Sequence, residues 1–403
     1  MAWRPSISAI TPPPPTNFSA SAVEKGAALA HLGDCAVCHT ARAGQDFAGG
    51  LAIKTPFGVV YTSNITPDAY RGIGRWSQAA FVRAMRKGVA RDGAHLYPAF
   101  PYDHYTLAPD GDLADLYAFL MTRKPVASSP PANRLIPPLG FRPVLAGWKL
   151  LFLKQGVVAA DSRRSPAWNR GRYLVESLAH CGGCHTARNA LGAEEPLRAL
   201  AGGQAEGWYA PPLDASSPAV QAWTAERLFT YLRTGLNPSH AAAAGPMGPV
   251  VRELSAAPAA DVQAIAVYIA SRMAPTQARA PGPVVDRAAF AASAQPQGAA
   301  LFAGACATCH GLGAPMMLQS RPSLTLGTPL YEPTPRDTVQ IILQGLNPPL
   351  GRSGPYMPAF ADSFSDVQIA QVTAYLRDRY TNRPPWSGDL RDQVAKARKE
   401  GGS

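Results

Sequence analysis

Three copies of one short motif contain all six cysteines of the chain. In each copy two residues separate the cysteines, and a histidine directly follows the second one. This spacing is the attachment signature of haem c, in which both thiols form thioethers with the vinyl groups and the histidine binds the iron. The predicted haem-attaching pairs are Cys35 and Cys38, Cys181 and Cys184, and Cys306 and Cys309, with His39, His185 and His310 as iron ligands. The sequence therefore predicts three covalent haem c groups.

Two other uses of paired cysteines fit the sequence less well. Two Cys-x-x-Cys units can close a tetrahedral zinc site, and a single unit can act as a redox-active dithiol. Neither use requires a histidine after every pair. The first cysteines of successive motifs are also 146 and 125 residues apart, unlike the short spacing of a zinc ribbon. We therefore favour haem attachment.

A methionine is predicted to be the second axial ligand in two of the repeats. Each repeat contains a helical segment that ends at a glycine, which is Gly235 in the second repeat and Gly345 in the third. Met247 and Met357 stand twelve residues after these glycines, in expected loops beside Pro or Gly. A thioether opposite histidine raises the haem potential, which suits electron transfer. Most methionines fill cores, so the matched offset is what favours ligation.

The first repeat departs from this pattern. The same count from Gly88 leads to Phe100, whose side chain cannot bind iron. We predict His104, four residues further on, as the distal ligand, because imidazole is a competent axial ligand. His95, Met85 and an open coordination position stay as alternatives.

The segments around the motifs predict an all-α fold. A helical segment introduced by a glycine precedes each motif, and an amphipathic helix with aromatic residues closes each repeat. The introducing glycines are Gly26, Gly171 and Gly298, and the closing segments are 112–120, 261–269 and 366–376. An opening helix crossed by a closing helix, with haem between them, resembles the class I cytochromes c. We predict three tandem domains of this kind.

Shifts in composition mark the joints between these domains. Residues 125–143 are rich in Pro and Ser, and residues 274–285 are rich in Pro. The predicted parts are an N-terminal stub at 1–19, haem c domain 1 at 20–125, a linker with an apolar surface segment at 126–164, haem c domain 2 at 165–276, a linker at 277–293, haem c domain 3 at 294–382 and a tail at 383–403.

Two of these parts raise questions of surface contact. The apolar segment 144–156 is too short to span a bilayer, so it is expected to rest in a membrane interface, to contact a partner protein, or to support the contact between haem domains. The basic tail is expected to be a solvated helix rather than a docking arm.

Composition excludes disorder as the main state, since 46% of the 403 residues are hydrophobic. No apolar run reaches the roughly 18 to 20 residues of a spanning helix, so the chain as written is expected to be soluble. Its first residues and the proline run at 12–15 look like the stub that remains after an export signal or anchor is removed. Haem attachment favours the periplasmic side of the inner membrane.

Four segments carry a resemblance to a known family. Residues 33–41, 55–68, 96–102 and 147–152 resemble the triple-haem cytochrome c subunit of bacterial membrane-bound dehydrogenases, and the match runs from about Ala22 to Tyr380. One branch of that family serves quinoprotein alcohol dehydrogenases, and another serves molybdopterin enzymes that oxidise aldehydes or N-heterocycles such as nicotinate. The quinoprotein branch has a methionine where this chain has Phe100, so the chain looks more like the molybdopterin branch.

The resemblance implies an electron relay. A catalytic dehydrogenase subunit and an iron–sulfur subunit would deliver electrons to the haems, which would pass them to ubiquinone or a terminal oxidase. The sequence contains no Walker loop, no nucleotide-binding glycine fingerprint and no convincing nucleophile with its base, so no catalytic site of its own is expected.

Two rival functions compete with the relay. A haem peroxidase is one, because Phe100 permits an open first haem. The net charge of +11 also suits nucleic acid, but three covalent haems argue against that role.

Overall fold

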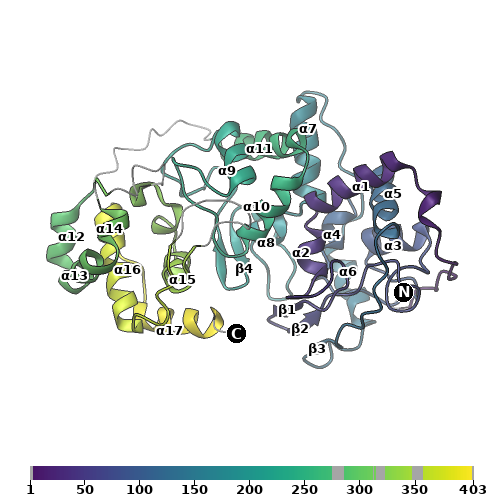
Figure 1. The fold of residues 1–403 in the computed structure, drawn as a ribbon, viewed down its shortest axis with the longest axis horizontal. Coiled ribbons are helices and arrows are strands. Elements are labelled where there is room, and N and C mark those ends of the chain that lie inside the picture. The colour runs from purple at the N-terminus through teal and green to yellow at the C-terminus, as the bar shows by residue number, and fades with distance from the viewer. Residues whose placement is uncertain (1–2, 275–285, 312, 315–322, 347–356, 402–403) are drawn as a thin grey trace. The chain divides into compact units, whose positions relative to one another are not determined.

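The computed structural model describes residues 3–274, 286–311, 313–314, 323–346 and 357–401. These residues form a mostly helical protein, as predicted, with two small antiparallel sheets that the sequence did not predict (Figure 1). The chain divides into two compact units, Met1–Gly183 with Ala256–Ile265 and Cys184–Ser255 with Ala266–Ser403. This division differs from the three predicted domains, whose boundaries stay a prediction.

The first unit begins with the elements around the first motif. They are η1 (Pro15–Asn17), α1 (Ala20–Leu32), α2 (Cys35–His39), β1 (Ala52–Thr55), β2 (Gly58–Tyr61), α3 (Gln78–Lys87), α4 (Tyr102–Tyr105) and α5 (Asp110–Met121). The unit continues through β3 (Arg134–Leu135), α6 (Val144–Phe152), α7 (Pro166–Tyr173) and η2 (Leu174–Leu178).

The elements after the second motif lie mainly in the second unit. They are α8 (Gly182–His185), η3 (Pro196–Arg198), β4 (Gly203–Ala205), β5 (Trp208–Ala210), α9 (Ala225–Thr234), α10 (Met247–Ala256) and α11 (Ala259–Met273). The third repeat adds α12 (Ala288–Ala294), α13 (Pro296–Ala305), α14 (Ala307–His310), η5 (Leu324–Leu326), η6 (Thr328–Leu330), α15 (Arg336–Gln344), α16 (Asp366–Tyr380) and α17 (Leu390–Gly401).

In the first unit the opening helix α1 packs against the closing helix α5 (Figure 1). The helices approach closely at Gly26, where an added Cβ would lie 2.0 Å from the carbonyl oxygen of Asp115. Only glycine fits this crossing, because a methyl group there would overlap a backbone atom. Leu29 and Leu116 are among the buried residues of the two helices.

A short hairpin follows each of the first two motifs. In the first unit β1 pairs with β2 in an antiparallel register that matches Ala52 with Tyr61, and β3 extends the sheet. In the second unit β4 pairs with β5, matching Gly203 with Ala210. Each hairpin turns the chain back toward the histidine of the preceding motif.

The opening helix of the second repeat belongs to the first unit. Arg170 on α7 binds Asp261 on α11 at 2.8 Å and Asp112 on α5 at 3.4 Å. Tyr173 donates its hydroxyl hydrogen to the same Asp112 at 2.8 Å. After α7 the helix widens into one π turn, η2, of a kind often found at functional sites.

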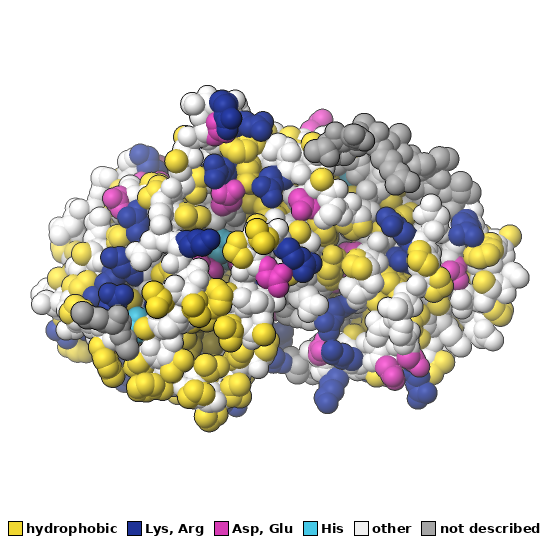
Figure 2. Space-filling model, turned by 180° about the vertical axis from the view of Figure 1, so that it is seen from behind, with side chains coloured by type: hydrophobic (Ala, Val, Ile, Leu, Met, Phe, Trp, Pro, Cys, Tyr) yellow, Lys and Arg dark blue, Asp and Glu magenta, His cyan; other side chains and the backbone are white. Residues whose placement is uncertain are grey.

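The apolar segment forms the helix α6 on the first unit. Lys149 points inward and donates hydrogen bonds to the carbonyls of Lys87 and Gly88, which closes the C-terminal end of α3. Burial lowers the pKa of Lys149 to about 7. The opposite face of α6 is apolar and exposed, with Leu150 at 87% and Leu151 at 67%. In Figure 2 hydrophobic side chains gather at the lower left, over this unit.

No helix within the described ranges combines the length and apolar character needed to cross a membrane.

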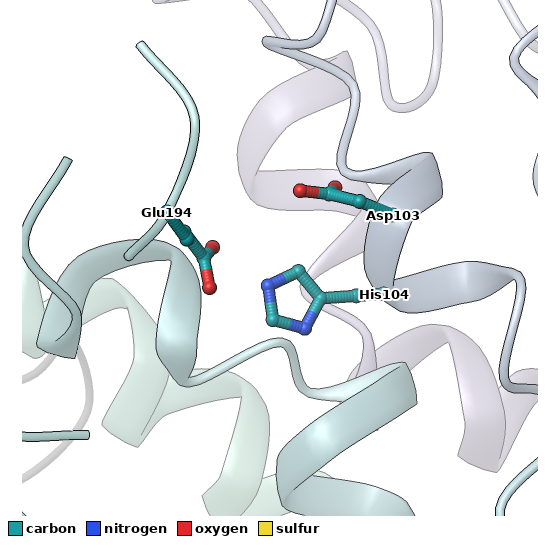
Figure 3. Close-up of side chains that lie close together, drawn as sticks. All are labelled: Asp103, His104 and Glu194. Atoms are coloured by element: carbon teal, nitrogen blue, oxygen red, sulfur yellow. The ribbon is translucent and has the colours of Figure 1, made fainter. Parts of the chain in front are cut away.

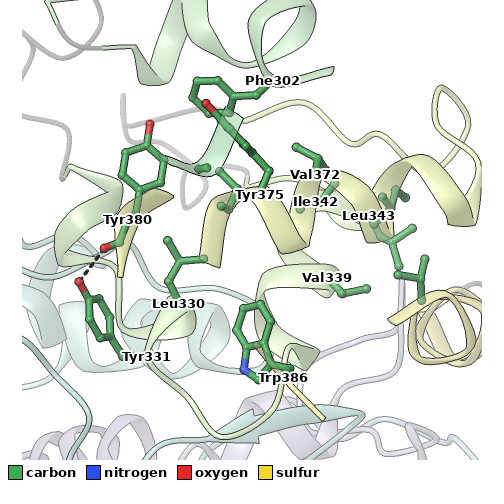
Figure 4. Packing of buried hydrophobic residues seen from close by; sticks show 14 of the residues in the cluster. Phe302, Leu330, Tyr331, Val339, Ile342, Leu343, Val372, Tyr375, Tyr380 and Trp386 are labelled. Carbon is green, nitrogen blue, oxygen red and sulfur yellow. Dashed lines mark hydrogen bonds between the residues drawn. The ribbon is translucent and has the colours of Figure 1, made fainter. Parts of the chain in front are cut away.

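In the second unit α13 and α16 repeat the crossing of an opening and a closing helix. An added Cβ at Gly298 would lie 2.3 Å from the carbonyl oxygen of Gln371. The core beside this crossing contains Phe302, Tyr375 and other apolar residues from α15 and α16 (Figure 4). Tyr331 donates a hydrogen bond to the carbonyl of Tyr380 across it at 2.8 Å. The third repeat therefore closes in the same way as the first.

The expectation of a solvated tail is wrong. Val394 on α17 is fully buried in the core of the third repeat. Arg398 binds Asp366 on α16 at 2.7 Å. Trp386, before α17, donates its indole N–H to the carbonyl of Glu332 at 2.8 Å. Between its basic residues the tail carries an apolar stripe at helical spacing, and this stripe packs on the core.

Candidate haem-binding sites

The first motif forms a short helix with its histidine held in one orientation. Asp34 takes the left-handed conformation, with φ of 51°, and turns the chain from α1 into α2. The Nδ1–H of His39 donates to the carbonyl of Ser63 at 2.6 Å. Desolvation lowers the pKa of His39, against a smaller rise from this hydrogen bond. A neutral imidazole with Nδ1 held in this way presents Nε2 as the ligand atom.

The second motif repeats this geometry. His180, directly before Cys181, is left-handed with φ of 37°. The Nδ1–H of His185 donates to the carbonyl of Pro211 at 2.6 Å, and desolvation again lowers the pKa of this histidine. The backbone hydrogen bonds match too, since the N–H of Gly49 donates to the carbonyl of His39 and the N–H of Gly202 donates to the carbonyl of His185. The two histidines therefore have the same tautomer, are each held by a backbone carbonyl and stand at the same position after the turn.

The third motif lies between α13 and the end of α14. His310 is the last residue of α14, and the Tyr380 hydroxyl donates to its carbonyl oxygen at 3.3 Å. Burial, with the nearby Cys309, raises the pKa of the Cys306 thiol to about 11. Residues 315–322, which follow this motif, lie outside the described residues.

The donor set fits covalent haem better than the alternatives. All six cysteines are described, and none forms a disulfide. Among the described residues no cysteine belongs to a group of three or more ligands that could hold a metal ion. Each thiol pair is instead followed by its own histidine on a short helical turn. The residues present therefore match the needs of haem c at each motif.

Phe100 and Met247 occupy equivalent positions in the first two repeats. After Gly88 the chain forms a bridge between Val89 and His95, and after Gly235 it forms the same bridge between Leu236 and Ala242. The N–H of Phe100 then donates to the carbonyl of Tyr97, and in the same way the N–H of Met247 donates to the carbonyl of Ala244. The equal offsets from the two glycines thus reflect an equal backbone path.

The expectation that Met247 lies in a loop is wrong, because this residue begins the helix α10. Pro246 and Pro249 flank this start. Proline is favoured in the first helical turn, where its missing N–H would have no helical partner. The prolines that suggested a loop therefore mark a helix N-terminus.

Met357 has a different local structure from Met247. It pairs with Leu346 through two backbone hydrogen bonds of 2.9 Å. In the bridge it takes the place of His95 and Ala242, which stand five residues before Phe100 and Met247. The equal offset of twelve residues therefore does not correspond to an equal backbone position in the third repeat. Residues 347–356 lie outside the described residues.

His104 extends from α4, next to Asp103 (Figure 3), and is 9% exposed. Its Nδ1–H donates to the carbonyl of Glu176 at 2.8 Å. The hydroxyl of Ser177 donates in return to the carbonyl of His104 at 3.1 Å. His104 therefore joins α4 to η2, with Nδ1 held by a carbonyl as in the proximal histidines.

His95 takes part in a different contact. It forms the bridge with Val89, and its Nδ1 lies 3.0 Å from the Lys149 ammonium. Met85 is 5% exposed in the core of the first unit. The contacts of His95 and the burial of Met85 are consistent with structural roles, and both residues stay alternatives for the distal position.

Several features of these sites were not predicted. The left-handed Asp34 and His180 and the carbonyls of Ser63 and Pro211 act through the backbone, which leaves no residue-type signature. Asp and His before the first cysteine were a weak signal, since both types are enriched among left-handed residues.

Crossed helices with a Cys-x-x-Cys-His turn define the class of c-type cytochromes, which carry covalent haem c. Two family models agree with this assignment. Residues 23–124 match the family described as cytochrome c. Residues 293–376 match the family described as cytochrome C oxidase, cbb3-type, subunit III.

Curated relatives specify the class further. The chain is 46% identical to a nicotinate dehydrogenase subunit of Pseudomonas putida over 100% of its length, but it spans only 34% of that protein. It is 37% identical to the fructose dehydrogenase cytochrome subunit of Gluconobacter japonicus, covering 92% of this chain and 82% of the relative. It is 35% identical to the alcohol dehydrogenase (quinone) cytochrome c subunit of Gluconacetobacter polyoxogenes, covering 94% and 84%. The chain belongs to this family of dehydrogenase cytochrome c subunits, which transfer electrons.

Proposed function

We propose that the chain holds three haem c groups and passes electrons from a catalytic dehydrogenase subunit to an acceptor. The observation that carries this proposal is the threefold Cys-x-x-Cys-His motif, with the same histidine support in its first two copies. Bound haem c supplies reversible one-electron chemistry. The chain's own residues fasten it through thiols and orient the iron-binding imidazoles through Ser63 and Pro211.

The proposed distal ligands are His104 for the first motif, Met247 for the second and Met357 for the third. His104 is preferred to His95 because its Nδ1–H donates to a carbonyl, which makes Nε2 the unprotonated ligand atom, whereas the Nδ1 of His95 accepts from Lys149, which places the ring proton on Nε2. Met247 is supported by its equal backbone position with Phe100, where the quinoprotein branch has a methionine. For Met357 the support is its backbone pairing with Leu346, which stands two residues after the end of α15.

We propose a molybdopterin enzyme with an iron–sulfur subunit as the electron donor, acting on an N-heterocycle or an aldehyde. The support is the identity of 46% over the whole chain with a nicotinate dehydrogenase subunit, against 37% and 35% for the fructose and alcohol enzymes. The acceptor is ubiquinone or a terminal oxidase, on the periplasmic side of the inner membrane.

The exposed face of α6 is the proposed membrane contact. Val144, Leu150 and Leu151 point away from the unit, whereas Leu145 and Lys149 are buried against it. An amphipathic helix of this kind binds in the headgroup region without spanning the bilayer.

Substrate-driven haem reduction tests the proposed donor. The chain is tagged in its native bacterium and the complex is purified, with a strain lacking the chain as the control. Nicotinate or an aldehyde should reduce the haems within the complex, and co-purifying subunits should contain molybdopterin and iron–sulfur clusters. Reduction by an alcohol through a quinoprotein subunit would contradict this donor.

A further inference from the structure

The turns that lead into the first and second motifs touch inside the first unit. Gly33 stands two residues before Cys35, and Leu178 stands three residues before Cys181. An added Cβ at Gly33 would lie 3.4 Å from both the Cδ1 and the carbonyl oxygen of Leu178. Leu178 therefore lies close to Gly33, which brings the segments that lead into the two haem-attachment motifs together at this point.

An aromatic pair spans the same junction. The ring of Tyr105 on α4 meets the ring of His180 edge to face, with centroids 5.7 Å apart and planes at 71°. His180 is bonded directly to Cys181. Its left-handed backbone and its Nδ1–H bond to the carbonyl of Leu178, at 3.0 Å, fix the direction of the ring.

Tyr105 is buried in this junction, which also adjoins the first motif. It is 6% exposed. Its neighbour His104 is hydrogen-bonded to η2, and η2 packs against α1, the helix that leads into the first motif. The ring is therefore in contact with the residue before the first thiol of the second motif, and that residue is hydrogen-bonded to Leu178, which lies close to Gly33 before the first motif.

We propose that Tyr105 and His180 form the bridge through which electrons pass between the first and second haems. The proposal rests on the proposed function and adds a step in the order of the relay, because it makes these two haems neighbours. In this step one ferrous iron is oxidised and one ferric iron is reduced by a single electron, and no bond or proton changes place. Electron tunnelling weakens steeply across empty space. Two rings in contact therefore couple the haems more strongly than the gap that would remain if one ring were removed.

The neighbouring contacts hold the bridge in place. Ser177 and Glu176 bind the carbonyl and the imidazole of His104, which anchors α4 on η2 one residue before Tyr105. Tyr102, on the same short helix, packs instead on Trp148, and its ring lies against Gly88. Tyr105 and His180 thus form the bridge itself, and Tyr102 is a matched buried tyrosine outside the junction.

Flash photoreduction of the purified holoprotein tests the bridge. One haem is reduced by a photoexcited donor, and the redistribution of the electron between the first two haems is followed by absorbance. Tyr105→Leu and His180→Leu should each slow this redistribution by an order of magnitude or more. Tyr105→Phe, which keeps the ring, should retain the wild-type rate, and so should the control Tyr102→Leu.

The outcomes separate this proposal from the proposed function. Wild-type redistribution in both Tyr105→Leu and His180→Leu, with all haems attached, would overturn the bridge. Loss of haem attachment in the wild-type chain would instead overturn the proposed function. Since His180→Leu probes the contact from the other side, a folding failure of Tyr105→Leu leaves the test intact.

Discussion

The proximal histidines work because a backbone carbonyl holds each ring in one tautomer. Ser63 and Pro211 accept the Nδ1–H of His39 and His185 at the same distance of 2.6 Å. The sequence predicted these histidines from their place after the cysteines. It did not predict their supports, because a carbonyl belongs to every residue and its position depends on the hairpin that carries it.

The distal ligands give a prediction at the same scale. Magnetic circular dichroism of the oxidised holoprotein should show one bis-histidine haem and two histidine–methionine haems. His104→Met should convert the first into a histidine–methionine haem and raise its potential, because a thioether favours the ferrous state within the ~0.8 V range that axial ligands span. His95→Gln is the control and should leave the spectrum unchanged. A wild-type spectrum without a bis-histidine component would rule out His104.

At the scale of elements, helices were predicted and short strands were not. The opening and closing helices have long apolar faces, and the glycines at their crossings, Gly26 and Gly298, are explained by contact with Asp115 and Gln371. The strands have only two to four residues each, too few for a period-two pattern to stand out. The tail was misjudged because Val394 and Ala397 form a stripe too short to outweigh the surrounding charges.

The helix α6 gives the prediction for an element. Leu150→Ser with Leu151→Ser should abolish most binding of the purified chain to anionic lipid vesicles, measured by flotation, because the change removes apolar area from the exposed face. The free energy of unfolding should change by no more than about 1 kcal/mol, because each exposed substitution usually changes it by no more than about 0.5 kcal/mol. The matched control is Leu191→Ser with Leu197→Ser, two exposed leucines of the second unit. Equal vesicle binding by both double variants would exclude α6 as the membrane contact.

At the scale of the molecule, the repeats do not coincide with the compact units. The opening helix of the second repeat belongs to the first unit through Arg170, Asp112 and Asp261, whereas α9 and the third repeat belong to the second unit. Sequence could define the repeats, because each has its own motif. It could not define the units, because ion pairs between distant segments depend on how helices pack.

The number of covalent haems tests the central claim most directly. Intact mass spectrometry of the mature chain, purified from a host with a haem c ligation system, should show a mass increase equal to three haem groups. Replacing Cys306 and Cys309 with Ser should reduce the increase to two groups. A wild-type increase of two groups or fewer would contradict the account.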